Sequence, residues 1–200
     1  GLDGLTEDLP FHDPYLFADM EKAISRIKQA IDSKERVIIF GDYDVDGITS
    51  TAILVKTLQN LGATVSYRLP NREKDGYGLN PKFIDEFIEK EIGLVITVDC
   101  GISCRTEIVK AKENKIDMII TDHHLPGENT PNADAIVNPN QKGDVFDVII
   151  LVARHQIENR TSKLLLALIH AQIQLPHDHQ RLLVGIGASH VEVEMRKSAQ

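Results

Sequence analysis

Apolar, β-branched runs alternate with segments of helical periodicity between residues 35 and 140, and this alternation constrains the fold more than any other feature. The first run, at 37–40, ends at Gly41 and has the continuous apolar character of a strand buried on both faces. The segments between the runs carry apolar residues every three or four positions, as amphipathic helices do. The alternation therefore predicts an α/β fold, with a mostly parallel sheet and helices on both of its faces.

The chain divides into three parts on this basis. Residues 1–34 form an N-terminal arm and helix, residues 35–140 form the α/β core, and residues 141–200 form a remainder whose fold the sequence leaves open. The pattern predicts strands at 37–40, 63–67, 94–98, 118–121 and 135–137, and helices at 15–31, 48–61, 81–90 and 103–114. In the remainder we expect an apolar run at 145–153, a helix at 159–175 and a short strand at 181–187.

Composition limits the class of protein without choosing its substrate. The formal net charge of −8 argues against a nucleic-acid partner, because phosphate backbones attract lysine and arginine. Much of the acid lies in one short loop, however, where bound divalent cations would neutralise it locally. No apolar stretch approaches the ~20 residues that span a bilayer, and the acidic N-terminus lacks the features of a signal peptide. We therefore expect a cytoplasmic protein that does not enter the membrane, with Cys100 and Cys104 as free thiols.

Potential metal ligands follow three of the predicted strands, directly where each strand ends. Three aspartates follow the first strand, one follows the third, and an Asp-His-His tripeptide follows the fourth: Asp42, Asp44, Asp46, Asp99, Asp122, His123 and His124. The carboxyl ends of parallel strands lie at one edge of the sheet, and ligands bind at that edge in such folds. Scattered solvated acids would not be sorted in this way, so the sequence predicts a metal site there.

The acidic loop places Asp42, Asp44 and Asp46 on alternate residues between Gly41 and Gly47. If this segment is extended, the alternate spacing puts all three carboxylates on the same side. Three crowded carboxylates repel one another, and a divalent cation with its preference for oxygen ligands would remove that penalty. The alternatives are a solvated acidic turn and the start of an EF-hand. The EF-hand is disfavoured because a strand precedes the loop and no glutamate occupies its twelfth position.

The other two clusters add different chemistry. Asp99 alone also fits a turn-forming aspartate, but its position at the third strand end would let it bridge two ions. In the Asp122-His123-His124 tripeptide, one imidazole can bind metal and the other can meet a substrate phosphate, while the aspartate orients an imidazole from behind. A pair of surface histidines is the alternative. Mixed carboxylate and imidazole ligands suit two Mn²⁺ or Mg²⁺ ions, the arrangement used for in-line phosphoryl displacement.

A polar loop at 70–80 leaves the second predicted strand at the same edge of the sheet. The planar guanidinium of Arg72 is suited to a phosphate, and the ring of Tyr77, which lies between two glycines, is suited to stacking on a base. The alternative is a surface loop with ordinary charges.

Five segments together resemble the successive motifs of the DHH phosphoesterases, and in particular those of their RecJ branch. They are GDYDVDGITS at 41–50, PNR at 70–72, GYGLN at 76–80, VDCGIS at 98–103 and TDHH at 121–124. The resemblance covers about residues 35–140 and implies a Mn²⁺- or Mg²⁺-dependent exonuclease that degrades single-stranded DNA from the 5′ end. It also implies metal ligation by Asp44, Asp46, Asp99 and His123, with Asp42 a ligand or directly behind one and His124 facing the scissile phosphate. Phe40 stands where many relatives have a metal-binding histidine.

The resemblance ends after Asn140. Resembling chains continue to a strand that ends in Gly-Thr-x-Ala-Asp, whose aspartate completes the second metal site. Here the segment LVGIG at 183–187 is followed by Ala188-Ser189-His190, and His190 is either a substitute ligand or a surface residue. The HDH segment at 177–179 is interpreted as a polar turn. We therefore expect an incomplete metal-binding half that lacks the second domain of resembling proteins.

Three hypotheses follow. The first is a two-metal phosphodiesterase of RecJ type that acts on single-stranded DNA. The second is a DHH hydrolase of short oligonucleotides or nucleotide phosphates. The third is a catalytically impaired scaffold that binds metal or nucleic acid, which the missing aspartate favours. The sequence predicts no particular oligomeric state.

Overall fold

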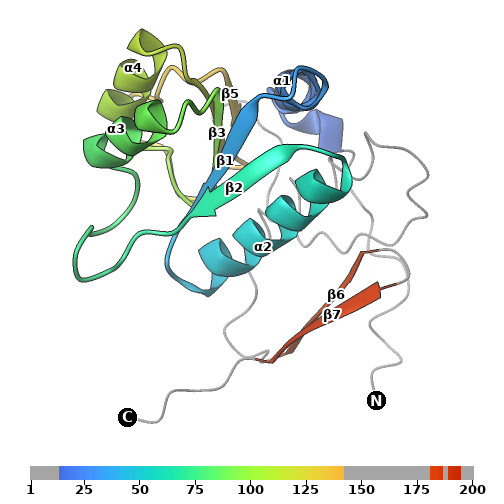
Figure 1. Ribbon diagram of the computed structural model, residues 1–200. Coiled ribbons are helices and arrows are strands. Elements are labelled where there is room, and N and C mark those ends of the chain that lie inside the picture. The colour runs from blue at the N-terminus through green and yellow to red at the C-terminus, as the bar shows by residue number, and fades with distance from the viewer. Residues whose placement is uncertain (1–13, 142–180, 187–188, 195–200) are drawn as a thin grey trace.

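A five-stranded parallel sheet forms the centre of the protein (Figure 1). The structure is a computed structural model that describes residues 14–141 and the backbone of residues 181–186 and 189–194. The strands are β1 (Arg36–Gly41), β2 (Thr64–Arg68), β3 (Leu94–Val98), β4 (Asp117–Thr121) and β5 (Ala135–Val137), in the order β2-β1-β3-β4-β5. The helices are η1 (Pro14–Leu16), α1 (Met20–Asp32), α2 (Val45–Asn60), α3 (Pro81–Glu89) and α4 (Arg105–Glu113). The predicted α/β fold is confirmed.

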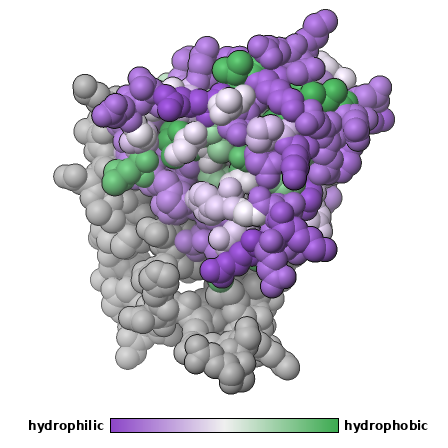
Figure 2. Space-filling model, turned by 90° about the vertical axis from the view of Figure 1, so that its left-hand side faces the viewer, coloured by the Kyte–Doolittle hydropathy of each residue, from purple (hydrophilic) through white to green (hydrophobic). Residues whose placement is uncertain are grey.

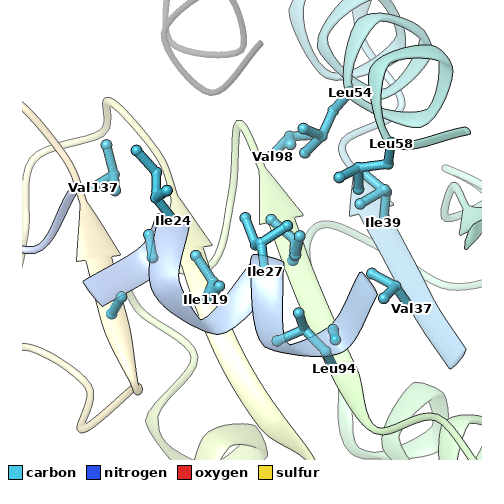
Figure 3. Packing of buried hydrophobic residues seen from close by; sticks show 14 of the residues in the cluster. Ile24, Ile27, Val37, Ile39, Leu54, Leu58, Leu94, Val98, Ile119 and Val137 are labelled. Atoms are coloured by element: carbon cyan, nitrogen blue, oxygen red, sulfur yellow. The ribbon is translucent and has the colours of Figure 1, made fainter. Parts of the chain in front are cut away.

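Side chains from the strands alternate between two hydrophobic clusters, one on each face of the sheet. Along β1, Val37 packs with α1 and α2, whereas Ile38 packs with α3 and α4. Figure 3 shows the first cluster, in which Ile27 of α1 and Leu58 of α2 lie over the strands. Each fully buried isoleucine or leucine contributes roughly 1.5–3 kcal/mol, so burial of these faces holds the helices in place more than helix propensity does. The expectation of helices on both faces is confirmed.

Three helices begin at residues other than those predicted, and the smallest shift is in α4, which was predicted from residue 103 and begins at Arg105. The helix predicted from residue 15 is interrupted, because a 3-10 turn at Pro14–Leu16 precedes α1, which begins at Met20. The apolar spacing continues through both segments, so periodicity could not separate them. The helix predicted from residue 48 begins at Val45 instead, because the carboxylate of Asp44 accepts a hydrogen bond from the N–H of Gly47 and caps it.

The strand order places a topological switch point between β1 and β3. From β1 the chain moves to one side for β2, and it then crosses to the other side for β3, β4 and β5. The loops that leave the carboxyl ends of β1 and β3 lie at this switch point, which is where ligands bind in such folds. Both loops carry residues predicted to bind metal.

The described part of the C-terminal region is a backbone hairpin of β6 (Arg181–Ile186) and β7 (Ser189–Glu194), paired antiparallel. The strand predicted at 181–187 is confirmed over residues 181–186, and residue 187 lies outside the described residues. The predicted helix at 159–175, the apolar run at 145–153 and the HDH segment at 177–179 lie outside the described residues. Among the described residues, no helix has the length and apolar character needed to cross a lipid bilayer.

Candidate metal centre

Two groups of potential metal ligands lie at the carboxyl edge of the sheet, and they share one residue. Asp42, Asp44 and Asp99 form one group, and Asp99, His123 and His124 form the other. Within each group the potential ligand atoms all lie within 4.8 Å of one another. The loops after β1, β3 and β4 therefore converge, as the positions of these residues at strand ends predict.

Asp99 belongs to both groups, and its backbone conformation is unusual. Its backbone has φ of 61°, a left-handed conformation that is uncommon outside glycine and concentrated at functional sites. Its backbone N–H donates to the carbonyl of Thr121 at 3.0 Å, which ties the end of β3 to β4. The side chain is buried, and burial together with the nearby carboxylate of Asp44 raises the pKa of Asp99 to about 8.

One carboxylate oxygen of Asp99 has no hydrogen-bond partner. This atom, Oδ1, is buried. Nδ1 of His123 lies 3.1 Å from it, but the two are not aligned for a hydrogen bond. A buried polar atom without a partner is unfavourable, and such atoms mark places where a bound ion or water belongs.

The acidic loop positions its aspartates in three different ways. Asp42 is buried, and its Oδ1 accepts a hydrogen bond from the N–H of Tyr43 at 2.7 Å. Burial raises the pKa of Asp42, and the charge of Asp44 acts in the same direction. Asp44 caps α2 and remains in the first ligand group. Asp46 lies in the first turn of α2 and belongs to neither group.

The expectation that residues 42–46 form one extended segment with aligned carboxylates is wrong. Because α2 begins at Val45 and a helix turns about 100° per residue, Asp46 does not continue the alternation of Asp42 and Asp44. After burial and the carboxylate of Asp44, its charge also contributes to the raised pKa of Asp99. Metal ligation by Asp46 stays a prediction.

Asp122 organises the two histidines from behind. Its Oδ1 accepts hydrogen bonds from the backbone N–H groups of His123 at 2.8 Å and His124 at 3.1 Å, and it lies 2.7 Å from Nδ1 of His124. Its Oδ2 accepts the N–H of Ile102 at 2.9 Å. A carboxylate with these donors acts as an acceptor, so Nδ1 of His124 carries a proton and donates it to Asp122.

The two imidazoles differ in their surroundings. The rings stack with centroids 4.6 Å apart, but the side chain of His123 is 18% exposed and that of His124 is 46% exposed. Burial, followed by the charge of His124, lowers the pKa of His123. The lowered pKa favours the neutral form of His123 at pH 7, which can ligate a metal, whereas the ring of His124 is more exposed to solvent.

Two asparagines that were not predicted as site residues support the histidine backbone. Nδ2 of the fully buried Asn138 donates to the carbonyl of His124 at 2.9 Å, and Nδ2 of Asn140 donates to the carbonyl of His123. Both residues follow β5, so a loop from a fourth strand end fixes the Asp-His-His turn. These two asparagines follow a strand end as the aspartates do, so their position in the sequence could have indicated them as site residues.

The loop at 70–80 folds towards the centre. The ring of Tyr77 lies edge-on to His124 at a centroid distance of 6.3 Å and edge-on to Tyr43 at 6.4 Å. The guanidinium of Arg72 lies 5.5 Å from the ring centroid of Tyr43. Burial, and then the charge of Asp42, raise the pKa of Tyr77. Tyr43, which was not predicted, thus joins the two candidate substrate-binding residues to the acidic loop.

Phe40 packs its side chain into the hydrophobic core. Its side chain is fully buried, and its ring packs against Phe83 at 4.9 Å and Phe87 at 6.3 Å between centroids. These contacts place Phe40 in the hydrophobic cluster beneath α3 and α4. Phe40, which stands where many relatives have a histidine, is therefore a residue of the hydrophobic core.

Part of the chain is similar in sequence to curated exonucleases. The RecJ single-stranded-DNA-specific exonuclease of Bacillus subtilis is 46% identical over 141 residues, which are 70% of this chain and 18% of that protein. The corresponding exonuclease of Escherichia coli is 43% identical over 122 residues, 60% of this chain and 21% of that protein. The chain thus spans about a fifth of the length of these curated relatives.

Two solved structures share the fold. A crystal structure of exonuclease RecJ bound to manganese matches with a TM-score of 0.66 and 31% identity, over 82% of this chain and 39% of that one. RecJ of Thermus thermophilus in complex with Mn²⁺ matches with a TM-score of 0.60 and 30% identity, over 80% of this chain and 22% of that one. The family model described as the DHH family, N-terminal domain, matches residues 36–182. The chain therefore belongs to the DHH family.

Proposed function

We propose that this chain is the metal-binding part of a phosphodiesterase that uses two Mn²⁺ or Mg²⁺ ions to remove nucleotides from the 5′ end of single-stranded DNA. The observation that carries the proposal is the sharing of Asp99 between two groups of potential ligands. A carboxylate between two sites is suited to bridge two ions about 3.5–4 Å apart, the spacing used for in-line phosphoryl displacement.

The residues present fit such ions. Oδ1 of Asp99 is buried without a partner, and the pKa values of Asp42 and Asp99 are both raised by burial and by the carboxylate of Asp44. Divalent cations would relieve this crowding of negative charge. Carboxylate oxygens with an imidazole nitrogen are the donor set that Mn²⁺ and Mg²⁺ accept, whereas thiolate-preferring metals would require sulfur ligands.

The roles proposed for these residues follow from the burial of their side chains and from the position of the proton on His124. Asp42, Asp44, Asp99 and His123 would hold the ions, which supply Lewis acidity towards a phosphodiester. His124 keeps its proton on Nδ1 through Asp122, so its exposed Nε2 is free to contact a phosphate or a second ion. The buried Asp122 fixes the orientation of that ring.

The substrate assignment is supported by the names of the relatives and by the loop at 70–80. The curated relatives are described as single-stranded-DNA-specific exonucleases. Tyr77 is 59% exposed beside His124, and an exposed ring can stack on a base of any sequence. Arg72 brings a guanidinium to the same side of the acidic loop, where it can contact a phosphate.

The first test measures metal binding without reference to activity. Isothermal titration with MnCl₂ should give two ions per chain, and Asp99→Ala should remove both. The matched control is Asp32→Ala, which deletes an exposed aspartate at the end of α1 and should leave two ions bound. Two ions bound by the Asp99→Ala chain would refute a shared ligand.

The second test measures cleavage. With Mn²⁺, the chain should release mononucleotides from a single-stranded oligonucleotide labelled at the 3′ end, with progressive shortening from the 5′ end. A dinucleotide substrate separates this function from a small-substrate DHH hydrolase, which would prefer the dinucleotide. Metal binding without release of nucleotide from either substrate would favour a scaffold and refute catalysis by this chain.

A further inference from the structure

The arginines of the described residues are of two kinds. Arg26, Arg36 and Arg68 form ion pairs with glutamate or aspartate. Within residues 14–141, Arg72 and Arg105 form none. A planar guanidinium without a carboxylate partner is available for an anion such as a phosphate. Arg72 belongs to the loop already described, whereas Arg105 has no part in the proposed metal centre.

Arg105 begins α4 at the same edge of the sheet as the metal centre. The turn before it is bound to that centre, because the N–H of Ile102 donates to Oδ2 of Asp122 at 2.9 Å. On its other side, Sγ of Cys104 lies 3.7 Å from the carbonyl of Leu79, two residues after Tyr77. The exposed Arg105 therefore stands between the Asp-His-His turn and the end of the loop at 70–80.

Lys82 extends this positive surface. It is exposed in the first turn of α3 and has no ion pair within residues 14–141. The start of α3 lies against α4, because Nζ of Lys110 donates to the carbonyl of Pro81 at 3.1 Å. Arg105 precedes Lys110 by about 7.5 Å along the helix axis. Both helices thus present a cation at the end where their dipoles are positive.

The acidic residues nearby do not cancel these cations. Asp85 of α3 is already paired with Lys110 at 2.6 Å. Glu107 in the first turn of α4 is half-buried and forms no ion pair with Arg105. The face that carries α3, α4 and the loop at 70–80 is turned to the viewer in Figure 2 and is mainly hydrophilic. A polar, negatively charged occupant suits it better than an apolar one.

We infer that Arg105 and Lys82 bind the phosphodiester backbone of a single DNA strand beyond the nucleotide held at the metal centre. The inference rests on the proposed function and assigns a path to the strand: from His124 past Tyr77, and then across the first turns of α4 and α3. Contacts of this kind position the strand without reading its sequence.

The experiment measures binding separately from cleavage. Fluorescence anisotropy of a labelled 12-nucleotide dT strand is recorded in a chelator, which prevents cleavage, over a series of NaCl concentrations. Each phosphate contact of a single strand contributes about −0.7 to the slope of log K against log salt. Arg105→Ala should therefore make the slope shallower by about 0.7, and Arg105→Ala with Lys82→Ala by about 1.4.

Lys28→Ala is the matched control, because Lys28 is an exposed cation on α1, on the opposite face of the sheet. This variant should keep the wild-type slope. Binding of a 5′-phosphorylated dinucleotide should be unchanged in all three variants, because a dinucleotide does not reach α4 and α3.

An unchanged slope in the double variant would overturn the inference, as would an equal loss of affinity for the dinucleotide. Either result is distinguishable from failure of the proposed function, which would appear as absence of Mn²⁺-dependent cleavage in the wild-type chain. Circular dichroism of the variants verifies that each slope refers to folded protein.

Discussion

Removal of the Asp122 carboxylate should separate the folding role of this residue from its role at the metal centre. The Asp122→Ala chain loses the acceptor for the backbone N–H groups of Ile102, His123 and His124 and for the ring of His124. The Asp122→Asn chain keeps one oxygen acceptor, but its amide N–H₂ must face either Ile102 or the histidines. The two variants therefore differ in how many donors remain unsatisfied.

The expected cost follows from which donors water can reach. Ile102 is 2% exposed and the side chain of His123 is 18% exposed, whereas His124 is open enough for water to replace the carboxylate. A buried donor without a partner costs about 1–3 kcal/mol. Asp122→Ala should therefore lower the free energy of unfolding by roughly 2–4 kcal/mol and Asp122→Asn by roughly 1–2 kcal/mol.

Metal binding should respond in a different order. Loss of a residue that positions metal ligands typically lowers metal affinity about 10–100-fold. Asp122 holds the backbone N–H of His123, the proposed ligand, and the ring of His124, which can contact a second ion. Asn cannot accept from both histidines while also serving Ile102. Both variants should therefore bind Mn²⁺ at least tenfold more weakly, even though Asn preserves more stability.

Urea denaturation monitored by circular dichroism, and titration with MnCl₂, measure the two effects. Asp85→Ala is the control, because it removes a carboxylate that is 58% exposed and forms one surface ion pair; its change should stay below about 1 kcal/mol. The reasoning is refuted if Asp122→Ala is as stable as the control variant, or if Asp122→Asn binds Mn²⁺ with wild-type affinity.

Three further predictions concern the strand-end loops. Asp44→Ser should keep the helix cap and hence stability, whereas Asp44→Ala should lose about 1 kcal/mol, and both should weaken Mn²⁺ binding in titrations. In a chelator, the free energy of unfolding should fall as pH rises from about 4, the ordinary aspartate pKa, towards 8. The pKa of Asp99 is raised to about 8 in the folded chain. Over this range the Asp99 carboxyl therefore loses its proton more readily in the unfolded chain, which favours unfolding. Urea denaturation across that range should show the decline in the wild-type chain, and Asp99→Asn should make the dependence of stability on pH flatter. A variant with the same pH dependence as the wild type would contradict the raised pKa of Asp99. Gly47→Ala should lower stability by roughly 1–3 kcal/mol, because its Cβ would lie 2.5 Å from the backbone of Asp42, whereas Gly127→Ala meets nothing within 4 Å and should leave the melting temperature unchanged.

Much of the fold and the edge on which the site lies could be predicted from residue order. The runs at 94–98 and 135–137 coincide with β3 and β5, because a strand buried on both faces needs continuous apolar residues over a short length. Asp99 and Asp122 follow such strands, and all parallel strands end at one edge, so their convergence required no knowledge of strand order. Helix starts were predicted less well, since apolar spacing is the same through a 3-10 turn as through a helix.

The tertiary structure decided which of these residues meet and in what state. Asp99 is shared by two ligand groups because β3 pairs with both β1 and β4, an order that strand composition does not encode. The same order brings Ile102 to Asp122 and places Tyr43 between Arg72 and Tyr77. Residue type and local spacing determine strands, turns and the kind of ligand, whereas burial, proton position and unpaired charge arise only from contacts between segments far apart in the chain.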